Sequence, residues 1–153
     1  MSEQYLGIVA SGAQLNGVHL EIDNDSAVLN NQFTWKLQSG DQALAYAAIY
    51  DRVKDYVQNN TVQKVVIKAS AVGKNKATLA HLKSAELRGV ICVAAVAGGA
   101  STTLVQKGTV SRTFGDRKVD EYVKDDSFWD NEVSGNLTKG RREAALLVLS
   151  QRS

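Results

Sequence analysis

Three short apolar stretches open this chain, the second and third with apolar residues at every other position, and their place ahead of any helical pattern constrains the fold most. They span residues 5–10, 17–23 and 33–37, and Asn, Asp and Gly residues stand between them. Alternation with a period of two is typical of half-buried strands, and such polar breaks favour hairpin connections. The sequence therefore predicts that three antiparallel strands begin the fold.

A helix and a strand are expected next. Residues 39–42 (Ser-Gly-Asp-Gln) resemble a capping box, and apolar residues then recur at helical spacing as far as Val57, before Asn59 and Asn60. The β-branched run from Gln63 to Lys68 suits a central strand that is buried on both faces. A strand that follows a helix of this length implies a parallel crossover.

The rest of the chain continues this alternation of helices and strands. Gly98 and Gly99 are expected to end the second helix, and Gly89 is expected to lie where that helix meets the sheet. The sequence thus predicts a single α/β domain over residues 1–153, with a mixed five-stranded sheet flanked by helices. The later segments are a helix over 75–97, a strand over 102–105, a polar connection over 106–115, a helix around Val119–Val123 and a final helix over 141–149.

Composition limits the classes of partner. The formal net charge is only +2, from 18 basic and 16 acidic residues, so any nucleic-acid binding must come from local clustering of charge. The single cysteine, Cys92, lies in an apolar run and is expected to be buried. No stretch is apolar enough to span a membrane, which favours a soluble cytoplasmic protein with no membrane partner.

The order of elements resembles the ribonuclease H-like fold, and local segments resemble its RuvC-type resolvase branch. The chain is also similar to small uncharacterised bacterial proteins of that fold, in which a Val-Val-Ile-Lys strand recurs. The segments that carry the resemblance are Leu6–Val9, Lys64–Ala69, Leu82–Ile91, Leu104–Phe114 and Arg142–Leu147.

The resemblance implies a metal site whose acids this chain mostly lacks. Carried over by position, the first acid falls on Val9, the second on Lys68 or Ala69 according to register, and the last on Glu143. Two-metal nucleases hold their ions between several carboxylates, and here only Glu143 is acidic. We therefore expect no metal, no other cofactor and no catalytic residue, and the residues favour a protein without enzymatic activity.

With the acids for catalysis mostly missing, binding is the function that the resemblance still implies. The leading interpretation is a catalytically degenerate RuvC-like protein that binds nucleic acid, with phosphate contacts from the predicted loop residues Lys74, Lys76, Lys107 and Arg112. Fold analogy alone is a weak warrant for function, so two alternatives stay open. One is a structural or protein-interaction module, such as a homodimer that packs its helices. The other is a metal-dependent nuclease with displaced ligands, for which Glu21 and Asp23 are candidates.

Some other residues invite a functional interpretation that their context does not favour. His19 and His81 form no known catalytic signature with a serine, and both are expected to be surface residues. Phe128 and Trp129 could stack on bases, but packing in the core or at an interface is the favoured interpretation of this aromatic pair.

Overall fold

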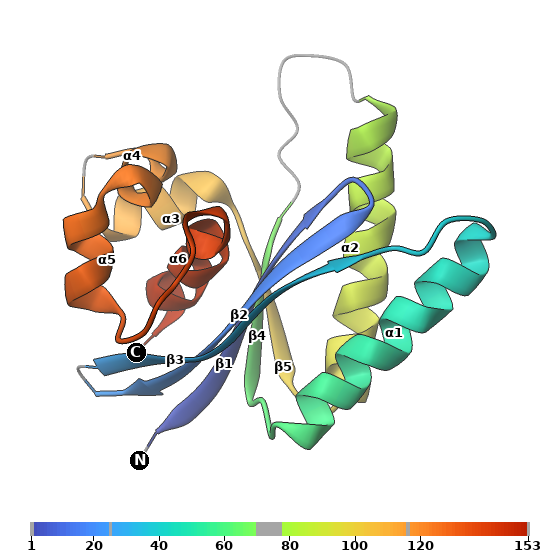
Figure 1. Ribbon diagram of the computed structural model, residues 1–153, viewed down its shortest axis with the longest axis horizontal. Coiled ribbons are helices and arrows are strands. Elements are labelled where there is room, and N and C mark those ends of the chain that lie inside the picture. Colours follow the sequence, from blue (N-terminus) through green and yellow to red (C-terminus); the bar gives the residue numbers. More distant parts are fainter. Residues whose placement is uncertain (1, 25, 70–77, 116, 153) are drawn as a thin grey trace.

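The computed structural model describes residues 2–24, 26–69, 78–115 and 117–152, and within them five strands form one mixed sheet with helices on both faces (Figure 1). The spatial order is β3-β2-β1-β4-β5. The first three strands pair antiparallel, while β4 and β5 run parallel to β1. The strands are β1 (Glu3–Ser11), β2 (Gln14–Asp23), β3 (Ser26–Lys36), β4 (Lys64–Lys68) and β5 (Ser101–Val105).

Two groups of helices cover opposite faces of this sheet. One face packs against α1 and α2, and the other packs against α6 and the short helices before it (Figure 1). The predicted mixed α/β architecture is confirmed. The helices are α1 (Gln42–Asn59), α2 (Leu79–Ala97), α3 (Lys107–Thr113), α4 (Val119–Lys124), α5 (Asp126–Glu132), the 3-10 helix η1 (Lys139–Arg141) and α6 (Arg142–Gln151).

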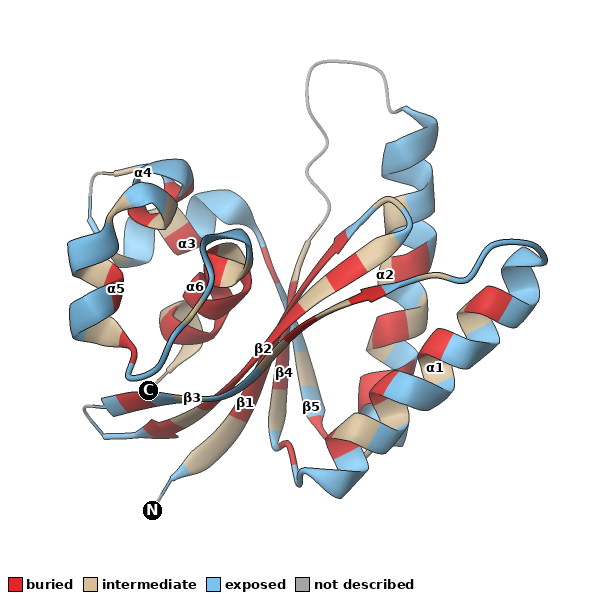
Figure 2. Cartoon of the chain, in the orientation of Figure 1, coloured by how far each residue is buried: buried red, intermediate tan, exposed pale blue. Residues whose placement is uncertain are grey.

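The core lies in two layers separated by the sheet, as the buried positions in Figure 2 show. Strand β1 contributes side chains to both core layers because successive side chains point to opposite faces of the sheet. Leu6 and Ile8 pack on the side of α1 and α2, whereas Tyr5 and Val9 pack on the side of α6. This explains why the strand reads as a continuous apolar run rather than as a strict alternation.

The structure differs from the sequence-based expectations at several boundaries. Asp41 alone caps α1 by accepting a hydrogen bond from the Leu44 N–H at 3.1 Å, so the Ser39–Gln42 capping box was wrong. Part of the expected polar connection at 106–115 is helical, as α3. Among the helices of the described residues, none combines the length and apolar content that crossing a bilayer requires.

The close approach between a helix and the sheet occurs at Gly7 rather than at Gly89. A Cβ atom at Gly89 would meet no heavy atom within 4 Å, and the residue is exposed on α2, so that expectation was wrong. A Cβ atom at Gly7 would lie 2.1 Å from the carbonyl oxygen of Ala144 on α6. The glycine in β1 therefore lets α6 lie directly on the sheet.

Candidate functional site at the carboxyl ends of β1 and β4

The positions carried over from the nuclease pattern meet at one edge of the sheet. Ile8 of β1 pairs with Ile67 of β4, so Val9 and Lys68, the next residue on each strand, lie level. Val9 packs with α6, and Lys68 also faces α6 because its side chain reaches that helix. Ala69 follows as the next residue and donates its N–H to Val105 at 2.9 Å. The strand register thus selects Lys68, not Ala69, as the residue beside Val9.

Glu143 lies in the first turn of α6 and faces the same position. Its Oε2 atom is 2.9 Å from Nζ of Lys68, and each side chain keeps about a quarter of its surface exposed, 26% for Lys68 and 27% for Glu143. The contact of α6 with β1 at Gly7 holds this first turn close to the strand ends. The one retained acid is therefore paired with a lysine at the place where the resemblance puts a second acid.

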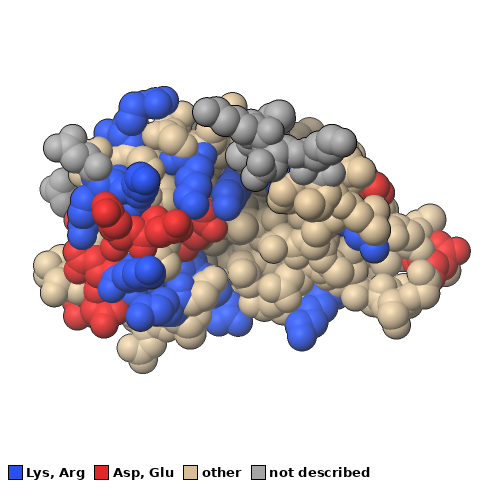
Figure 3. Space-filling view, turned by 90° about the horizontal axis from the view of Figure 1, so that it is seen from above, with Lys and Arg blue, Asp and Glu red and all other residues tan. Residues whose placement is uncertain are grey.

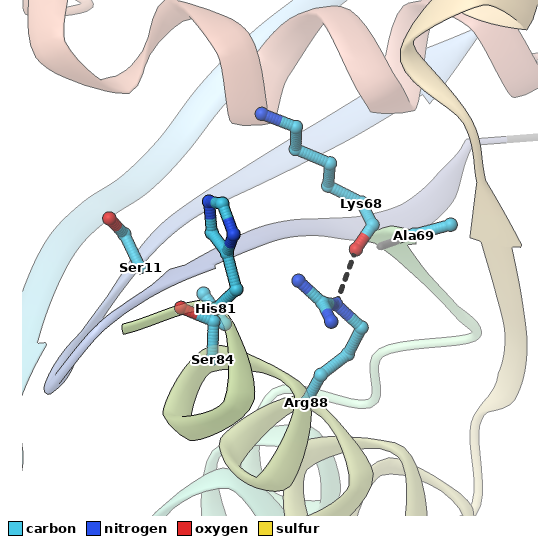
Figure 4. A pocket seen from close by; sticks show the side chains of 7 residues that line it. Ser11, Lys68, Ala69, His81, Ser84 and Arg88 are labelled. Carbon is cyan, nitrogen blue, oxygen red and sulfur yellow. Dashed lines mark hydrogen bonds between the residues drawn. The ribbon is translucent and has the colours of Figure 1, made fainter. Parts of the chain in front are cut away.

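Beside this ion pair, the strand ends and α2 enclose a pocket of about 240 Å³ (Figure 4). His81, Ser84 and Arg88 project from α2 into it, and Lys68 lies above them at the end of β4 (Figure 4). The Nε–H of Arg88 donates to the Lys68 carbonyl oxygen at 2.7 Å. Burial lowers the pKa of Arg88, but a guanidinium stays charged in proteins.

Ser84 joins the β1–β2 hairpin to α2. Its hydroxyl donates to the carbonyl of Ala80 at 2.9 Å and accepts the Gly12 N–H at 2.7 Å. Gly12 has a φ of 61°, a backbone conformation that favours glycine. These bonds hold the end of β1, including Ser11, beside the pocket.

His81 takes part in the cap of α2. The Thr78 hydroxyl accepts the His81 N–H at 3.2 Å, and the Thr78 N–H donates to Nδ1 of His81 at 3.4 Å. In the neutral ring, Nδ1 is therefore the acceptor and Nε2 carries the hydrogen. The ring presents a donor to the pocket, and its expected place on the surface is confirmed.

The four residues predicted to bind nucleic acid divide into two pairs. Lys74 and Lys76 lie outside the described residues. Lys107 and Arg112 lie on α3, where Lys107 is 3.3 Å from Asp120 and Arg112 donates to the Thr109 hydroxyl at 3.4 Å. Helix α3 begins two residues after Val105, and Val105 pairs with Lys68, so Lys107 belongs to the same edge of the sheet as the ion pair.

Other basic residues near this edge were not singled out from the sequence. Arg88 lines the pocket, and Lys139 and Arg141 lie on η1, just before α6. Seen from this edge, Lys and Arg side chains gather on the half of the molecule built by α3–α6, with Asp and Glu among them (Figure 3). These residues lie far apart in the sequence, and the fold brings them to the same edge. Nothing in the local sequence around each one therefore distinguishes it from an ordinary surface charge.

The candidate replacement ligands Glu21 and Asp23 lie on the wrong face. Leu20 and Ile22 pack in the core layer of α6, so Glu21 and Asp23, which alternate with them, face the side of α1. Glu143 lies on the α6 side. Throughout the described ranges, no three His, Cys, Asp or Glu side chains are grouped closely enough to hold a metal ion.

Two further expectations are resolved by burial. His19 is buried, with Nδ1 2.8 Å from the Tyr56 hydroxyl and Nε2 2.7 Å from Oε1 of Gln4, so its expected place on the surface was wrong. Trp129 is buried and its Nε1–H donates to the Tyr122 carbonyl at 2.8 Å, which confirms core packing over base stacking. Neither residue belongs to the site.

Comparisons with known proteins identify the fold. No family model matches the chain, and no curated protein matches its sequence. A structure of RuvC from Thermus thermophilus superimposes with a TM-score of 0.75 and 16% identity, over 96% of this chain and 92% of that one. The T. thermophilus RuvC structure in complex with a Holliday junction substrate gives 0.72 and 15%, over 97% and 91%. The chain therefore has a ribonuclease H-like fold of the RuvC type.

Proposed function

We propose that this protein binds nucleic acid at the RuvC-like edge of its sheet and does not cleave it. The observation that carries the proposal is the 2.9 Å ion pair between Lys68 and Glu143. The related fold includes a RuvC structure in complex with a Holliday junction substrate, which supports nucleic acid as the class of ligand. Branched DNA is accordingly one of the probes below.

A two-metal centre does not suit the residues at this position. Two Mg²⁺ ions need several carboxylates, and they stabilise the attacking and leaving oxygens of a phosphodiester. Here Val9 is apolar, and the Lys68 ammonium lies beside Glu143. A divalent ion would have to displace that ammonium, and it would then have Glu143 as its single carboxylate ligand. The lysine instead neutralises the one acid at the edge where a phosphate would approach.

The basic residues of α3 support binding of modest strength. Lys107 and Arg112 can each neutralise a phosphate, but Lys107 already lies 3.3 Å from Asp120, and acidic side chains are mixed with basic ones over this half of the molecule (Figure 3). We therefore expect weak, sequence-independent affinity that falls steeply with salt. Lys74 and Lys76 remain proposed contacts in the same binding mode.

Fluorescence anisotropy tests this function with duplex and four-way branched DNA over a series of salt concentrations. Replacing Lys107 and Arg112 together by Gln should flatten the log–log salt slope by about 2 on duplex DNA, because each lost phosphate contact contributes about 0.9. A matched control replaces Lys54 and Lys64, which lie on α1 and at the amino end of β4, by Gln. The control should keep the slope. No binding at low salt, or equal slopes in both double variants, would contradict the proposal.

A second candidate function is protein interaction, as a homodimer that packs its helices. It is favoured by apolar side chains on α2 and β5 that stay exposed: Val93 at 60%, Val96 at 62% and Leu104 at 52%. Val93 also lines a shallow apolar groove between α1 and α2, together with Tyr50 and Val90. Such an exposed apolar surface is typical of interaction sites.

Analytical ultracentrifugation separates this candidate from a monomeric binder. If the chain self-associates through α2, a Val96→Glu variant should sediment as a monomer at concentrations where the parent is a dimer. Leu44 is equally exposed, at 62%, but lies at the start of α1, so Leu44→Glu should leave the dimer intact. A parent protein that is monomeric throughout the concentration series would rule out the homodimer.

A further inference from the structure

The segment before α6 is tied to the edge strand β3. Gln32 of β3 donates through Nε2 to the Asn136 carbonyl at 2.7 Å, and its Oε1 atom accepts the Thr138 N–H at 2.9 Å. Leu137, between these two contacts, packs against the core layer on the α6 side. The segment therefore lies over β3 on the α6 face of the sheet.

Helix η1 is tied in turn to β2. Nδ2 of Asn16 donates to the Gly140 carbonyl at 3.5 Å, while Oδ1 of Asn16 accepts the Thr34 hydroxyl of β3. Within the segment, Arg141 donates from Nη1 to the Thr138 hydroxyl at 2.8 Å. We call the connected surface the η1 seam. It comprises Asn16, Gln32, Thr34 and residues 136–141.

The η1 seam lies next to the Lys68–Glu143 pair. Asn16 is level with Val9 in the ladder of β1 and β2, and Val9 is level with Lys68 on β4. Asn16 contacts the residues just before α6, and Lys68 contacts the first turn of α6. The seam and the ion pair therefore share one face of the sheet, with the seam on the side of β3.

Three cations surround the seam without an acid beside them. Lys36 follows Thr34 by two residues in β3, so it lies on the same face, and Lys139 and Arg141 lie on η1. Among the described residues, none of the three forms an ion pair. The chain segments 11–19, 29–40 and 133–142 contain no Asp or Glu. The seam is thus a patch of positive charge that its own segments leave unneutralised, in a chain whose net charge is only +2.

The seam and α3 lie on opposite sides of the ion pair. The seam covers β2 and β3, whereas α3 follows β5, and β3 and β5 are the two edges of the sheet. Four strand spacings separate these edges, or about 19 Å at about 4.8 Å each. Phosphates follow one another every 3.4 Å or so along a strand of duplex DNA, so about five or six of them cover this distance. A backbone laid across the strand ends would reach both groups of cations.

We propose that the η1 seam, with Lys36, Lys139 and Arg141, is a second surface for nucleic-acid phosphates, across the ion pair from α3. This inference rests on the proposed function, and it extends the contact from α3 to the whole width of the sheet edge. Asn16 and Thr34 use their side-chain hydrogen bonds within the seam. The seam therefore contributes charge rather than base recognition, and its contacts carry no sequence preference.

A salt series of anisotropy measurements with duplex DNA tests the seam. The Lys36 and Lys139 side chains are exposed, so replacing both by Gln should keep the fold. The double variant should flatten the log–log salt slope by about 2, because each lost phosphate contact contributes about 0.9. The matched control, with Lys54 and Lys64 replaced by Gln, should keep the slope. A slope that is unchanged in the Lys36/Lys139 variant would overturn the seam.

The same measurement separates the seam from α3. If the two surfaces contact different phosphates, combining the Lys36/Lys139 and Lys107/Arg112 replacements should flatten the slope by about 4. A slope that changes only in the Lys107/Arg112 variant would leave the proposed function standing and remove the seam. Failure of the parent protein to bind DNA at low salt would remove both.

Amide NMR shifts of the ¹⁵N-labelled protein locate the contact directly. Titration with duplex DNA should shift the Asn16 side-chain amide and the Gly140 N–H of the seam, together with the Gly108 N–H of α3. Gly99, which precedes the amino end of β5, should stay unshifted. In the Lys36/Lys139 variant the shifts at the seam should shrink while that of Gly108 persists. Shifts of the parent that are confined to α3 would contradict a ligand that spans the sheet edge.

Discussion

Lys68 at the end of β4 and Glu143 in the first turn of α6 lie 2.9 Å apart, at the positions where the resemblance to resolvases implies two acids. The pair depends on two longer-range contacts. The β1–β4 register sets the face on which Lys68 lies, and Gly7 allows α6 to sit close enough for Glu143 to reach it. The Lys68 ammonium neutralises this acid without a metal ion.

We expect the Lys68–Glu143 pair to contribute about 1 kcal/mol of coupling free energy, near the upper end for exposed pairs because both side chains are about three-quarters buried. A double-mutant cycle with Lys68→Met and Glu143→Gln, measured by urea unfolding, isolates this quantity. It also cancels the separate interaction of Glu143 with the α6 dipole. The coupling should shrink in 1 M salt. Losses that simply add in the double variant would show that the two charges do not interact.

Gly7→Ala should destabilise the protein by about 1–3 kcal/mol, because its Cβ would fall 2.1 Å from the Ala144 carbonyl oxygen and force α6 away from β1. Gly89→Ala is the matched control on exposed α2, and it should stabilise by about 0.5–1 kcal/mol because Ala is the better helix former. Thermal or urea unfolding measures both. Equal effects of the two substitutions would contradict the assignment of the close approach to Gly7.

The free energy of unfolding should depend on pH through His19. Burial lowers the pKa of His19 below its ordinary 6.5, and the charge of Glu21 opposes this only in part. The unfolded chain therefore binds the proton more tightly, so the stabilisation is complete above about pH 6.5 and is lost as pH falls toward the lowered value. Urea unfolding between pH 5 and 8 should show this slope.

A His19→Gln variant checks the assignment, because Gln can still bond to Tyr56 but does not titrate in this range. Its free energy of unfolding should change less between pH 6.5 and 5 than that of the parent. His81→Gln keeps His19 and should therefore keep the slope. If the His19→Gln profile runs parallel to that of the parent, the buried histidine is not the source.

The sequence predicts the order of strands and helices well because alternation and helical spacing are local signals. The placement of individual residues depends on pairing at a distance. Residue 68 or 69 could equally continue the β4 pattern, and only the register against β1 selects Lys68. His19 occupies a polar position in an alternating strand, which predicts exposure, but α1 covers that face through Tyr56.

The positions of the glycines that allow close packing also could not be predicted from local sequence. Gly89 stands among apolar residues of a helix, which suggested a close contact, but a helical pattern does not show which side of a residue meets the sheet. Gly7 lies in an apolar strand and carries no local sign that α6 will pass over it. The pocket likewise combines residues of β4 and α2 that lie apart in the sequence, so no sequence motif predicts it.

A cleavage assay tests the central claim most directly. Purified protein should be incubated with Mg²⁺ or Mn²⁺ and with duplex, single-stranded, branched and RNA–DNA hybrid substrates, at protein concentrations that saturate binding in the anisotropy experiment. We expect the branched and duplex substrates to be bound and every substrate to remain intact, because Lys68 is paired with Glu143 at the position where the resemblance implies a metal-binding acid. Metal-dependent cleavage that disappears in Glu143→Gln would contradict binding without catalysis.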